Sequence, residues 1–305
     1  FDGGIMGVAL GVVLGSFLQL IVSAVGLVGL GFDYNFKLYC RNRGFRKVLS
    51  LLPARSVDQG MDYVVSLVEV NLASRLADGT IRAYQQALTL HLMPINLIGV
   101  AISNAAFPQL TERLGEGRLD LFQKDLRSLL RIIFWMALPT SVVIFFTRGY
   151  IVHFIRNTGD QLMAGILGCL VVAILFRTIY HMAARAFYAR QDTKTPLYIS
   201  VFSISLNIAL AIILTMNLNM GAYGLAWAQS TVAVFEVVIL LLVMSKQMPR
   251  MFNRAFVTAI GKMIAASAVA GVVCYIGVSV MPFRDTDSSF FSAFPKFTII
   301  SIVSF

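Results

Sequence analysis

The sequence predicts an all-α fold, a polytopic transmembrane helix bundle, from three observations. Hydrophobic residues make up 58% of its 305 residues and charged residues only 13%, against roughly 45–50% and about 25% in a soluble domain. The apolar residues form runs long enough to cross a bilayer, which takes about 20 residues. Lys and Arg are concentrated in alternate connectors between these runs. A soluble globular fold is therefore excluded.

Eight apolar runs are long enough to span the membrane, and a ninth, truncated one begins near residue 297. The eight cover approximately residues 3–30, 53–77, 84–108, 128–147, 162–184, 197–216, 222–244 and 256–281. The sequence starts at Phe1 and stops at Phe305 within apolar residues. We therefore interpret it as a fragment of a longer protein.

The Lys and Arg residues predict the orientation of the spans. Of the 25, 17 lie in four alternating connectors, at 37–47, 109–131, 185–194 and 246–262. Three lie inside predicted spans: Arg55, Arg75 and Arg177. Because cytoplasmic loops carry an excess of Lys and Arg, the net charge of +10 indicates membrane topology rather than nucleic-acid binding.

The longest of these connectors, residues 109–131, predicts an amphipathic helix in the membrane interface. Its apolar residues recur at helical spacing: Leu119, Phe122, Leu126, Leu129 and Leu130. The apolar face of such a helix lies among the lipid headgroups. The helix would cap the following span, and a partner-binding role is the alternative.

The span at 53–77 carries a polar stripe on one face. At about 100° per residue, five polar side chains fall in one sector of the helix: Arg55, Asp58, Asp62, Ser66 and Glu69. Intramembrane charges face a cavity, a partner or a transport path, so a salt-bridge ladder and a cavity-lining helix both explain the stripe. Glu69 favours the cavity, because it has no basic residue on its own face and needs a cation, a proton or another helix.

A second polar cluster, Arg177, His181 and Arg185, ends the span at 162–184. The spacing of i, i+4 and i+8 places the three on one side of a helix. Guanidinium groups bind phosphate bidentately, so this stripe could hold a phosphate-bearing headgroup. Arg185 is also explained as an interface anchor, whereas Arg177 lies deeper. We interpret His91, in the third span, as a packing residue.

Motifs for catalysis or metal binding are absent from the sequence. The cysteines Cys40, Cys169 and Cys274 are far apart and form no CxxC or Cys/His pair, so neither a disulfide framework nor a metal site is indicated. No nucleophile elbow, HExxH or nucleotide-binding loop stands in a suitable context. We therefore expect no cofactor and no enzyme activity, and transport is the default function for a polytopic chain with cavity-facing charges.

Three segments resemble the MurJ/MviN family of lipid II flippases, in that family's order and approximate spacing. They are GFRKVLSLLPA at 44–54, PINLIGVAISNAAFPQLTE at 94–112 and RAFYARQDTKTP at 185–196. With GAYGLAWAQS at 221–230, the resemblance covers essentially the whole chain, from the family's sixth helix into its fourteenth. The loops that the family places in the cytoplasm correspond to the four basic connectors.

The resemblance implies two pseudo-symmetric six-helix lobes around a central cavity, followed by two helices that frame a lipid groove. It divides this chain into three parts. Residues 1–48 would be the last helix of the N-terminal lobe with a basic cytoplasmic linker, 49–250 the C-terminal six-helix lobe, and 251–305 additional, truncated C-terminal helices.

The function implied by the resemblance is the flipping of lipid II, an undecaprenyl-diphosphate-linked peptidoglycan precursor, across the bacterial cytoplasmic membrane by alternating access. A polar cavity would shelter the headgroup while the lipid tail stays in the bilayer, which avoids a large desolvation cost. Two alternatives stay open: a polysaccharide-lipid or multidrug exporter of the same superfamily, and a noncatalytic membrane scaffold. The expected partners are lipid II or a related polyprenyl-diphosphate lipid and the bilayer, without nucleic acid.

One departure from the family pattern concerns an expected cavity arginine. The family's eighth helix usually carries an Asp-Arg pair where this chain has Leu88 and Thr89. Either Arg55, Arg177 or His91 compensates, or the substrate differs.

A sodium ion is one coupling ion that the resemblance suggests, because some family members hold one between their seventh, eleventh and twelfth helices. The corresponding residues here are Glu69 and Asn207, with Gln229 or Ser230 as further ligands through side-chain oxygens. The acidic residue expected one turn after Asn207 is replaced by Ala211.

Overall fold

The computed structural model describes residues 4–27, 43–156, 160–248, 251–280 and 298, and every regular element in these ranges is a helix. The all-α prediction is thus confirmed. The chain divides into two compact units, Phe1–Ser50 and Leu51–Phe305, which are described separately.

The first unit contains helix α1, Gly4–Leu27, and the start of α2, Arg43–Ser74. Large apolar side chains of α1 are exposed on every side, from Met6 to Val25. A helix that is apolar all round requires an apolar environment. The stretch Ala9–Val25 is an apolar helix, shorter than the six helices that could cross a membrane.

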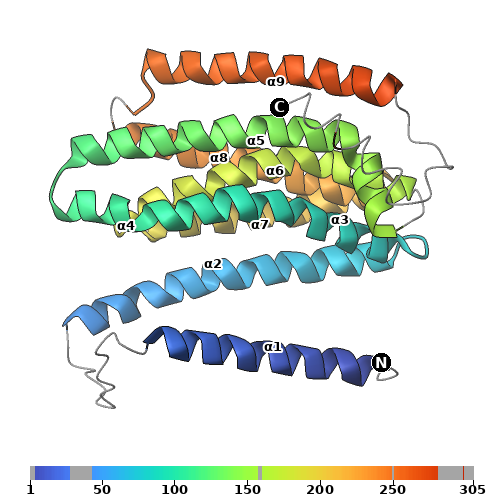
Figure 1. Ribbon diagram of the computed structural model, residues 1–305, viewed down its shortest axis with the longest axis horizontal. Coiled ribbons are helices and arrows are strands. Elements are labelled where there is room, and N and C mark those ends of the chain that lie inside the picture. The colour runs from blue at the N-terminus through green and yellow to red at the C-terminus, as the bar shows by residue number, and fades with distance from the viewer. Residues whose placement is uncertain (1–3, 28–42, 157–159, 249–250, 281–297, 299–305) are drawn as a thin grey trace. The chain divides into compact units, whose positions relative to one another are not determined.

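The second unit is a bundle built around α6, Gln161–Ala189, which contacts α3, α4, α5 and α8 (Figure 1). The other helices are α3 Thr80–Pro94, α4 Ala101–Gly115, α5 Leu119–Arg156, α7 Lys194–Ile212, α8 Ala222–Gln247 and α9 Arg254–Val280. Short π-helical segments, η1 Ile95–Val100 and η2 Ile213–Asn217, follow α3 and α7. Helix α7 packs mainly on α8, and α9 on α5.

Six of the eight predicted spans coincide with helices that are long and apolar enough to cross a membrane. These helices are Thr80–Gly115, Leu119–Phe154, Gln161–Ala189, Lys194–Asn217, Ala222–Gln247 and Arg254–Val280. The predicted spans at 3–30 and 53–77 contain shorter apolar stretches, Ala9–Val25 and Tyr63–Ser74. Apart from Thr298, the ninth predicted span lies outside the described residues.

The prediction of an interfacial helix in the connector 109–131 is wrong. Helix α4 continues to Gly115, and α5 begins at Leu119 and runs unbroken to Arg156. Phe122, Leu126 and Leu130 are fully buried in a core cluster that includes residues of α6 and α8. The apolar face of this segment therefore packs against protein, because the bundle extends beyond the apolar span on this side.

A glycine sets the distance between η1 and α6. A methyl group at Gly99 would lie 3.0 Å from the Cα and from the carbonyl oxygen of Thr178. Backbone atoms move aside less readily than the end of a flexible side chain, so any larger residue at position 99 would push η1 and α6 slightly apart. The residue before Thr178 is Arg177, and the close packing at Gly99 therefore also positions Arg177.

We predict that Gly99→Ala destabilises the bundle by about 1–3 kcal/mol, the usual cost of overpacking a core. The matched control is Gly149→Ala, because Gly149 is also helical and has open space where the methyl group would lie. Thermal unfolding of the purified variants in detergent measures both effects. Equal melting temperatures for the two variants would contradict the assigned role of Gly99.

Candidate functional site

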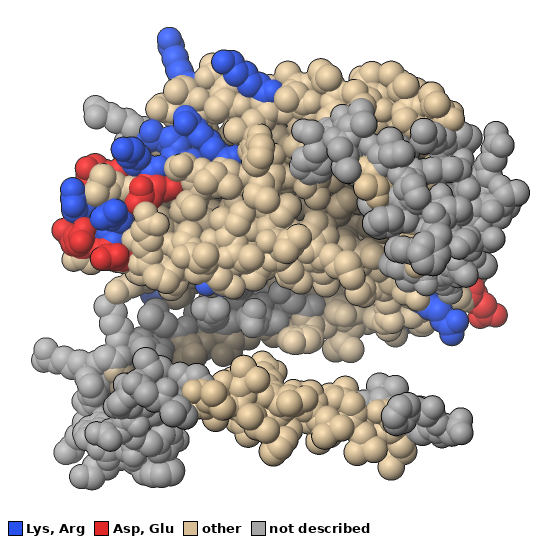
Figure 2. All heavy atoms as spheres, viewed as in Figure 1, with Lys and Arg blue, Asp and Glu red and all other residues tan. Residues whose placement is uncertain are grey.

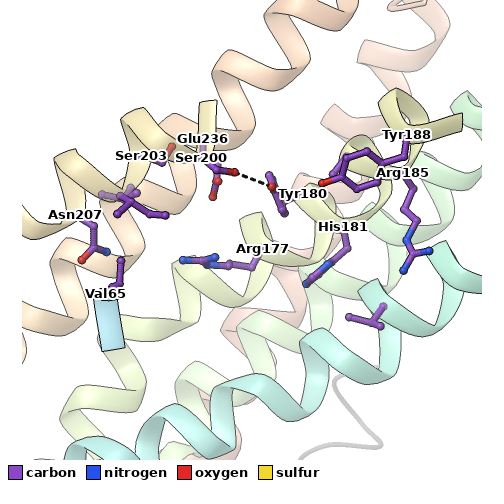
Figure 3. A pocket seen from close by; sticks show the side chains of 14 residues that line it. Val65, Arg177, Tyr180, His181, Arg185, Tyr188, Ser200, Ser203, Asn207 and Glu236 are labelled. Atoms are coloured by element: carbon purple, nitrogen blue, oxygen red, sulfur yellow. Dashed lines mark hydrogen bonds between the residues drawn. The ribbon is translucent and has the colours of Figure 1, made fainter. Parts of the chain in front are cut away.

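A cavity of about 270 Å³ lies in the second unit between α6, α7 and α8. Apart from Val65 of α2 and Val100 of η1, the residues that line it come from these three helices. Its polar side chains are Arg177, Tyr180, His181, Arg185 and Tyr188 of α6, Ser200, Ser203 and Asn207 of α7, and Glu236 of α8 (Figure 3). We call this space the polar cavity.

Helix α6 contributes more of the wall than any other helix, and its polar side chains recur at helical spacing. Arg177, His181 and Arg185 are four residues apart, and Tyr180 and Tyr188 lie on the same side of the helix. The structure thus brings the three basic residues of the sequence-based cluster to one cavity. The guanidinium of Arg185 also lies 5.6 Å from the ring centre of Phe107, a distance suited to a cation–π contact.

The opposite wall, on α7, has hydrogen-bonding capacity that the described residues do not use. Ser203 Oγ and Asn207 Oδ1 are buried and have no hydrogen-bond partner among them. Ser200 Oγ is 3.2 Å from the hydroxyl of Tyr180 across the cavity. Because buried polar atoms are normally satisfied by protein, water or ligand, this wall is suited to binding a polar group in the cavity.

Arg177 is tied to a buried hydrogen-bond network that joins α6 to α8, α2 and α3. Arg177 Nη2 donates to Gln229 Oε1 at 3.2 Å, and Gln229 Nε2 donates to Glu69 Oε1 at 2.8 Å. Tyr84 OH donates to the other carboxylate oxygen of Glu69 at 2.9 Å. Glu69 itself is 2% exposed. Both oxygens of the carboxylate are therefore hydrogen-bonded by neighbouring helices.

Sequence reasoning missed Tyr84 as the partner of Glu69, because a tyrosine in an apolar helix resembles an ordinary core residue. Glu69 was expected to need a cation, a proton or another helix, and here it is another helix that satisfies it. Sequence reasoning also missed Ser200 and Ser203, and it noted Glu236 only as a weak signal within the span at 222–244. The three-residue spacing of Ser200 and Ser203 was the available signal.

The polar stripe predicted on α2 is only partly described. The side chains of Arg55, Asp58 and Asp62 lie outside the described residues. Ser66 is exposed and Glu69 is buried in its network, and neither lines the polar cavity. The residue of α2 in the cavity wall is Val65.

Of the four residues considered for a sodium ion, Glu69, Gln229 and Ser230 are hydrogen-bonded to protein groups. Asn207 lies in the cavity wall, whereas the amide oxygen of Gln229 accepts from Arg177, a positive group that disfavours a cation. Ser230 Oγ donates to the carbonyl oxygen of Cys169 at 2.6 Å. Within the described ranges, no three His, Cys, Asp or Glu side chains cluster as metal ligands. Sodium binding stays a prediction.

Leu88 and Thr89, which stand where the family usually has an Asp-Arg pair, are uncharged and do not line the polar cavity. Leu88 packs against a core cluster, and Thr89 is exposed and donates to the carbonyl oxygen of Gln85. His91 is buried, with Nδ1 2.6 Å from the carbonyl oxygen of Leu88. Of the candidates for compensation, Arg177 lines the cavity and His91 does not, whereas the side chain of Arg55 lies outside the described residues.

Residues 2–292 match the family model described as "Lipid II flippase MurJ". The chain belongs to the lipid II flippase MurJ family. As a MurJ family member with six helices able to span a membrane, it is a multi-pass protein of the bacterial inner membrane.

Curated relatives support this assignment at modest identity. A probable lipid II flippase MurJ of Thermotoga maritima is 27% identical over 237 residues, which are 76% of this chain and 47% of that protein. Its counterpart in Borreliella burgdorferi is 24% identical over 251 residues, 80% of this chain and 49% of the relative. The chain thus spans about half the length of the curated relatives that it matches.

Solved structures show that the fold is shared with the MurJ family and with other transporters. The inward closed conformation of a lipid II flippase MurJ has a TM-score of 0.69 and 21% identity, and the match covers 99% of this chain and 62% of that one. An outward-facing multidrug resistance MATE family transporter of the MOP superfamily has a TM-score of 0.62 and 14% identity, and the match covers 85% of this chain and 61% of that one. At these identities, the similarity establishes the fold alone.

We predict that Gln229→Leu lowers the free energy of unfolding by about 1–3 kcal/mol, because it removes the two buried hydrogen bonds that Gln229 makes with Arg177 and Glu69. Gln85→Leu is the matched control, since Gln85 is exposed on α3. Unfolding in detergent, monitored by circular dichroism, measures both. If the two substitutions lower the free energy of unfolding equally, the network does not stabilise the bundle.

We also predict that a cysteine at Ser203 reacts with a membrane-impermeant, water-soluble maleimide, because Ser203 faces the polar cavity. The background is a variant in which Cys40, Cys169 and Cys274 are replaced by serine. Ser103→Cys is the control, because Ser103 is fully buried and does not line the cavity. Labelling is followed by mass spectrometry. Equal protection of the two cysteines would show that water does not reach the cavity.

Proposed function

We propose that this protein takes part in flipping lipid II, an undecaprenyl-diphosphate-linked peptidoglycan precursor, across the cytoplasmic membrane by alternating access. Family membership supports the substrate class, and the polar cavity supports a binding role for the bundle. We propose further that residues 49–250 act as the C-terminal lobe of a transporter. The chain spans about half the length of its curated relatives, so it would contribute one part of the pathway.

The observation that carries this proposal is the position of Arg177 in the polar cavity of an apolar bundle. A guanidinium presents its N–H donors in a planar fork that matches the oxygens of a phosphate. Arg–phosphate contacts are among the strongest hydrogen bonds available to a protein. Arg177 and Arg185, which share one face of α6, would therefore bind the diphosphate of the headgroup.

The α7 wall would bind the uncharged part of the headgroup nearest the diphosphate. Ser203 Oγ and Asn207 Oδ1, which lack partners among the described residues, are suited to hydroxyl and amide groups of a sugar. The cavity of about 270 Å³ is smaller than the roughly 300–1,000 Å³ of pockets that enclose drug-sized ligands. It would hold a diphosphate and its immediate neighbours, and the rest of the headgroup would extend beyond it.

The hydrogen-bond network would link the occupancy of the cavity to the packing of the helices. A phosphate that binds Arg177 competes with the amide oxygen of Gln229, whose other end is held by Glu69 of α2. A change at Arg177 would thus reach α2 and α3 through Gln229 and Glu69. Such a connection can bias a two-state transporter only to the extent that the substrate binds its two states differently.

The proposed cycle needs no covalent chemistry, so we do not propose an enzymatic activity. Coupling to a sodium ion remains a prediction from the family resemblance, and no step of the cycle uses it. The exporter and scaffold alternatives gain no support beyond the fold, because the MATE transporter is only 14% identical.

Complementation of a flippase-depleted bacterium tests the proposal. We expect Arg177→Ala to reduce lipid II translocation about tenfold or more at normal abundance, because a hydrogen bond to a charged group contributes about 1.5–3 kcal/mol. Arg177→Lys keeps the charge and should retain part of the activity. Arg75→Ala is the control, since Arg75 is exposed and lies outside the cavity. Unchanged translocation by Arg177→Ala would reject the role, and failure of the unsubstituted full-length protein to complement would reject the function.

A further inference from the structure

An apolar groove of about 490 Å³ lies between α5, α8 and α9, away from the polar cavity. Its walls include Leu130 and Phe134 of α5, Val238 and Leu242 of α8, and Phe256 and Ile260 of α9. Val238 and Leu242 are 42% and 57% exposed, so the groove opens to the outside of the bundle. In a membrane-spanning bundle, such an opening faces lipid.

Basic side chains lie around one end of this groove. The guanidinium carbon of Arg131 is 5.7 Å from the ring centre of Phe256, which lines the groove. Lys246 follows Ser245 in the groove wall, and Arg254 begins α9 two residues before Phe256. Figure 2 shows most of the visible Lys and Arg side chains at one end of the bundle, some of them beside Asp and Glu side chains.

The basic side chains at this end of the groove, Arg131, Lys246 and Arg254, have no salt-bridge partner in the part of the chain that the structure describes. The Nε atom of Arg131 is buried and has no hydrogen-bond partner among the described residues. Arg113 and Arg118, in contrast, both pair with Glu116 at the α4–α5 turn. The groove therefore has apolar walls and, at one end, basic side chains that form no salt bridge within the described residues.

We propose that this groove binds an anionic phospholipid of the bilayer, with an acyl chain between α8 and α9 and the headgroup phosphate at Arg131, Lys246 and Arg254. Basic pockets between transmembrane helices on the cytoplasmic side bind anionic headgroups. The connectors that flank the groove, 109–131 and 246–262, are the ones that the distribution of Lys and Arg places in the cytoplasm. The negatively charged leaflet supplies such lipids on that side.

This lipid site is separate from the polar cavity in position and chemistry. The groove uses α5 and α9, which do not line the cavity, and its wall is almost wholly apolar. The two sites share only α8, which presents Val232 and Glu236 to the cavity and Val238 and Leu242 to the groove. A lipid in the groove would hold α9 against the bundle, and it would not be transported.

Fluorescence quenching by brominated lipids tests the site directly. The probe is Phe134→Trp in the full chain, with Trp135 and Trp227 replaced by phenylalanine, reconstituted in phosphatidylcholine vesicles with increasing dibrominated phosphatidylglycerol. We expect stronger quenching by dibrominated phosphatidylglycerol than by dibrominated phosphatidylcholine. Arg131→Gln or Lys246→Gln should each weaken phosphatidylglycerol binding about fivefold, the effect of one basic residue near an anionic surface.

The matched control is Arg118→Gln, which removes one positive charge at the same end of the bundle without touching the groove. An equal loss in this variant would show general surface attraction and overturn the proposal. Equal quenching by the two brominated lipids would also overturn the proposal. No quenching by either lipid would overturn it too, and is the result expected if another segment of protein covers the groove. Stronger displacement by undecaprenyl diphosphate than by unlabelled phosphatidylglycerol would assign the groove to the transported lipid and reject a resident one. Lys246 is exposed, so its variant keeps the test valid if Arg131→Gln does not fold.

Discussion

The carboxylate of Glu69 is buried in a bundle whose surroundings are almost entirely apolar, and the helices around it are arranged to satisfy it. A charged group in such a place is tolerated only when neighbouring groups hydrogen-bond to it. Tyr84 of α3 and Gln229 of α8 supply those bonds, and Gln229 in turn accepts from Arg177 of α6. Four helices are thus held in register by one acid and its partners.

The same arrangement explains why a cationic side chain can line the polar cavity. Arg177 faces the cavity, and through Gln229 it is connected to the carboxylate that offsets its charge. The amide is well suited to stand between the two groups because it donates at one end and accepts at the other. The bundle can therefore present a cation to a ligand without leaving that cation unpartnered in the absence of the ligand.

Much of the fold could be predicted from the sequence, because lipid imposes a strong and local rule: each span must be long and apolar. The limits of α6 and α8 were predicted closely for this reason. The start of α5 was mispredicted because the same amphipathic pattern suits a headgroup layer and a protein core. Burial of Phe122, Leu126 and Leu130 depends on α6 and α8, which lie far away in the sequence.

The candidate site was less accessible to sequence reasoning than the fold. The basic face of α6 follows from spacing within one helix and was identified. The roles of Tyr84, Ser200 and Ser203 depend on which helices face each other, and periodicity within one helix carries no such information. Glu69 shows both sides of this limit, since its need for a partner could be inferred and the identity of that partner could not.

The unbroken course of α5 has a mechanical consequence. Its 38 residues extend about 57 Å at 1.5 Å per residue, whereas the hydrocarbon core of a bilayer is about 30 Å thick. The helix therefore continues well past the lipid, and in the orientation that the Lys and Arg residues predict, its N-terminal turns extend into the cytoplasm as a continuation of the part within the membrane. A force applied to those turns would be transmitted along a single helix to the residues that pack against α6.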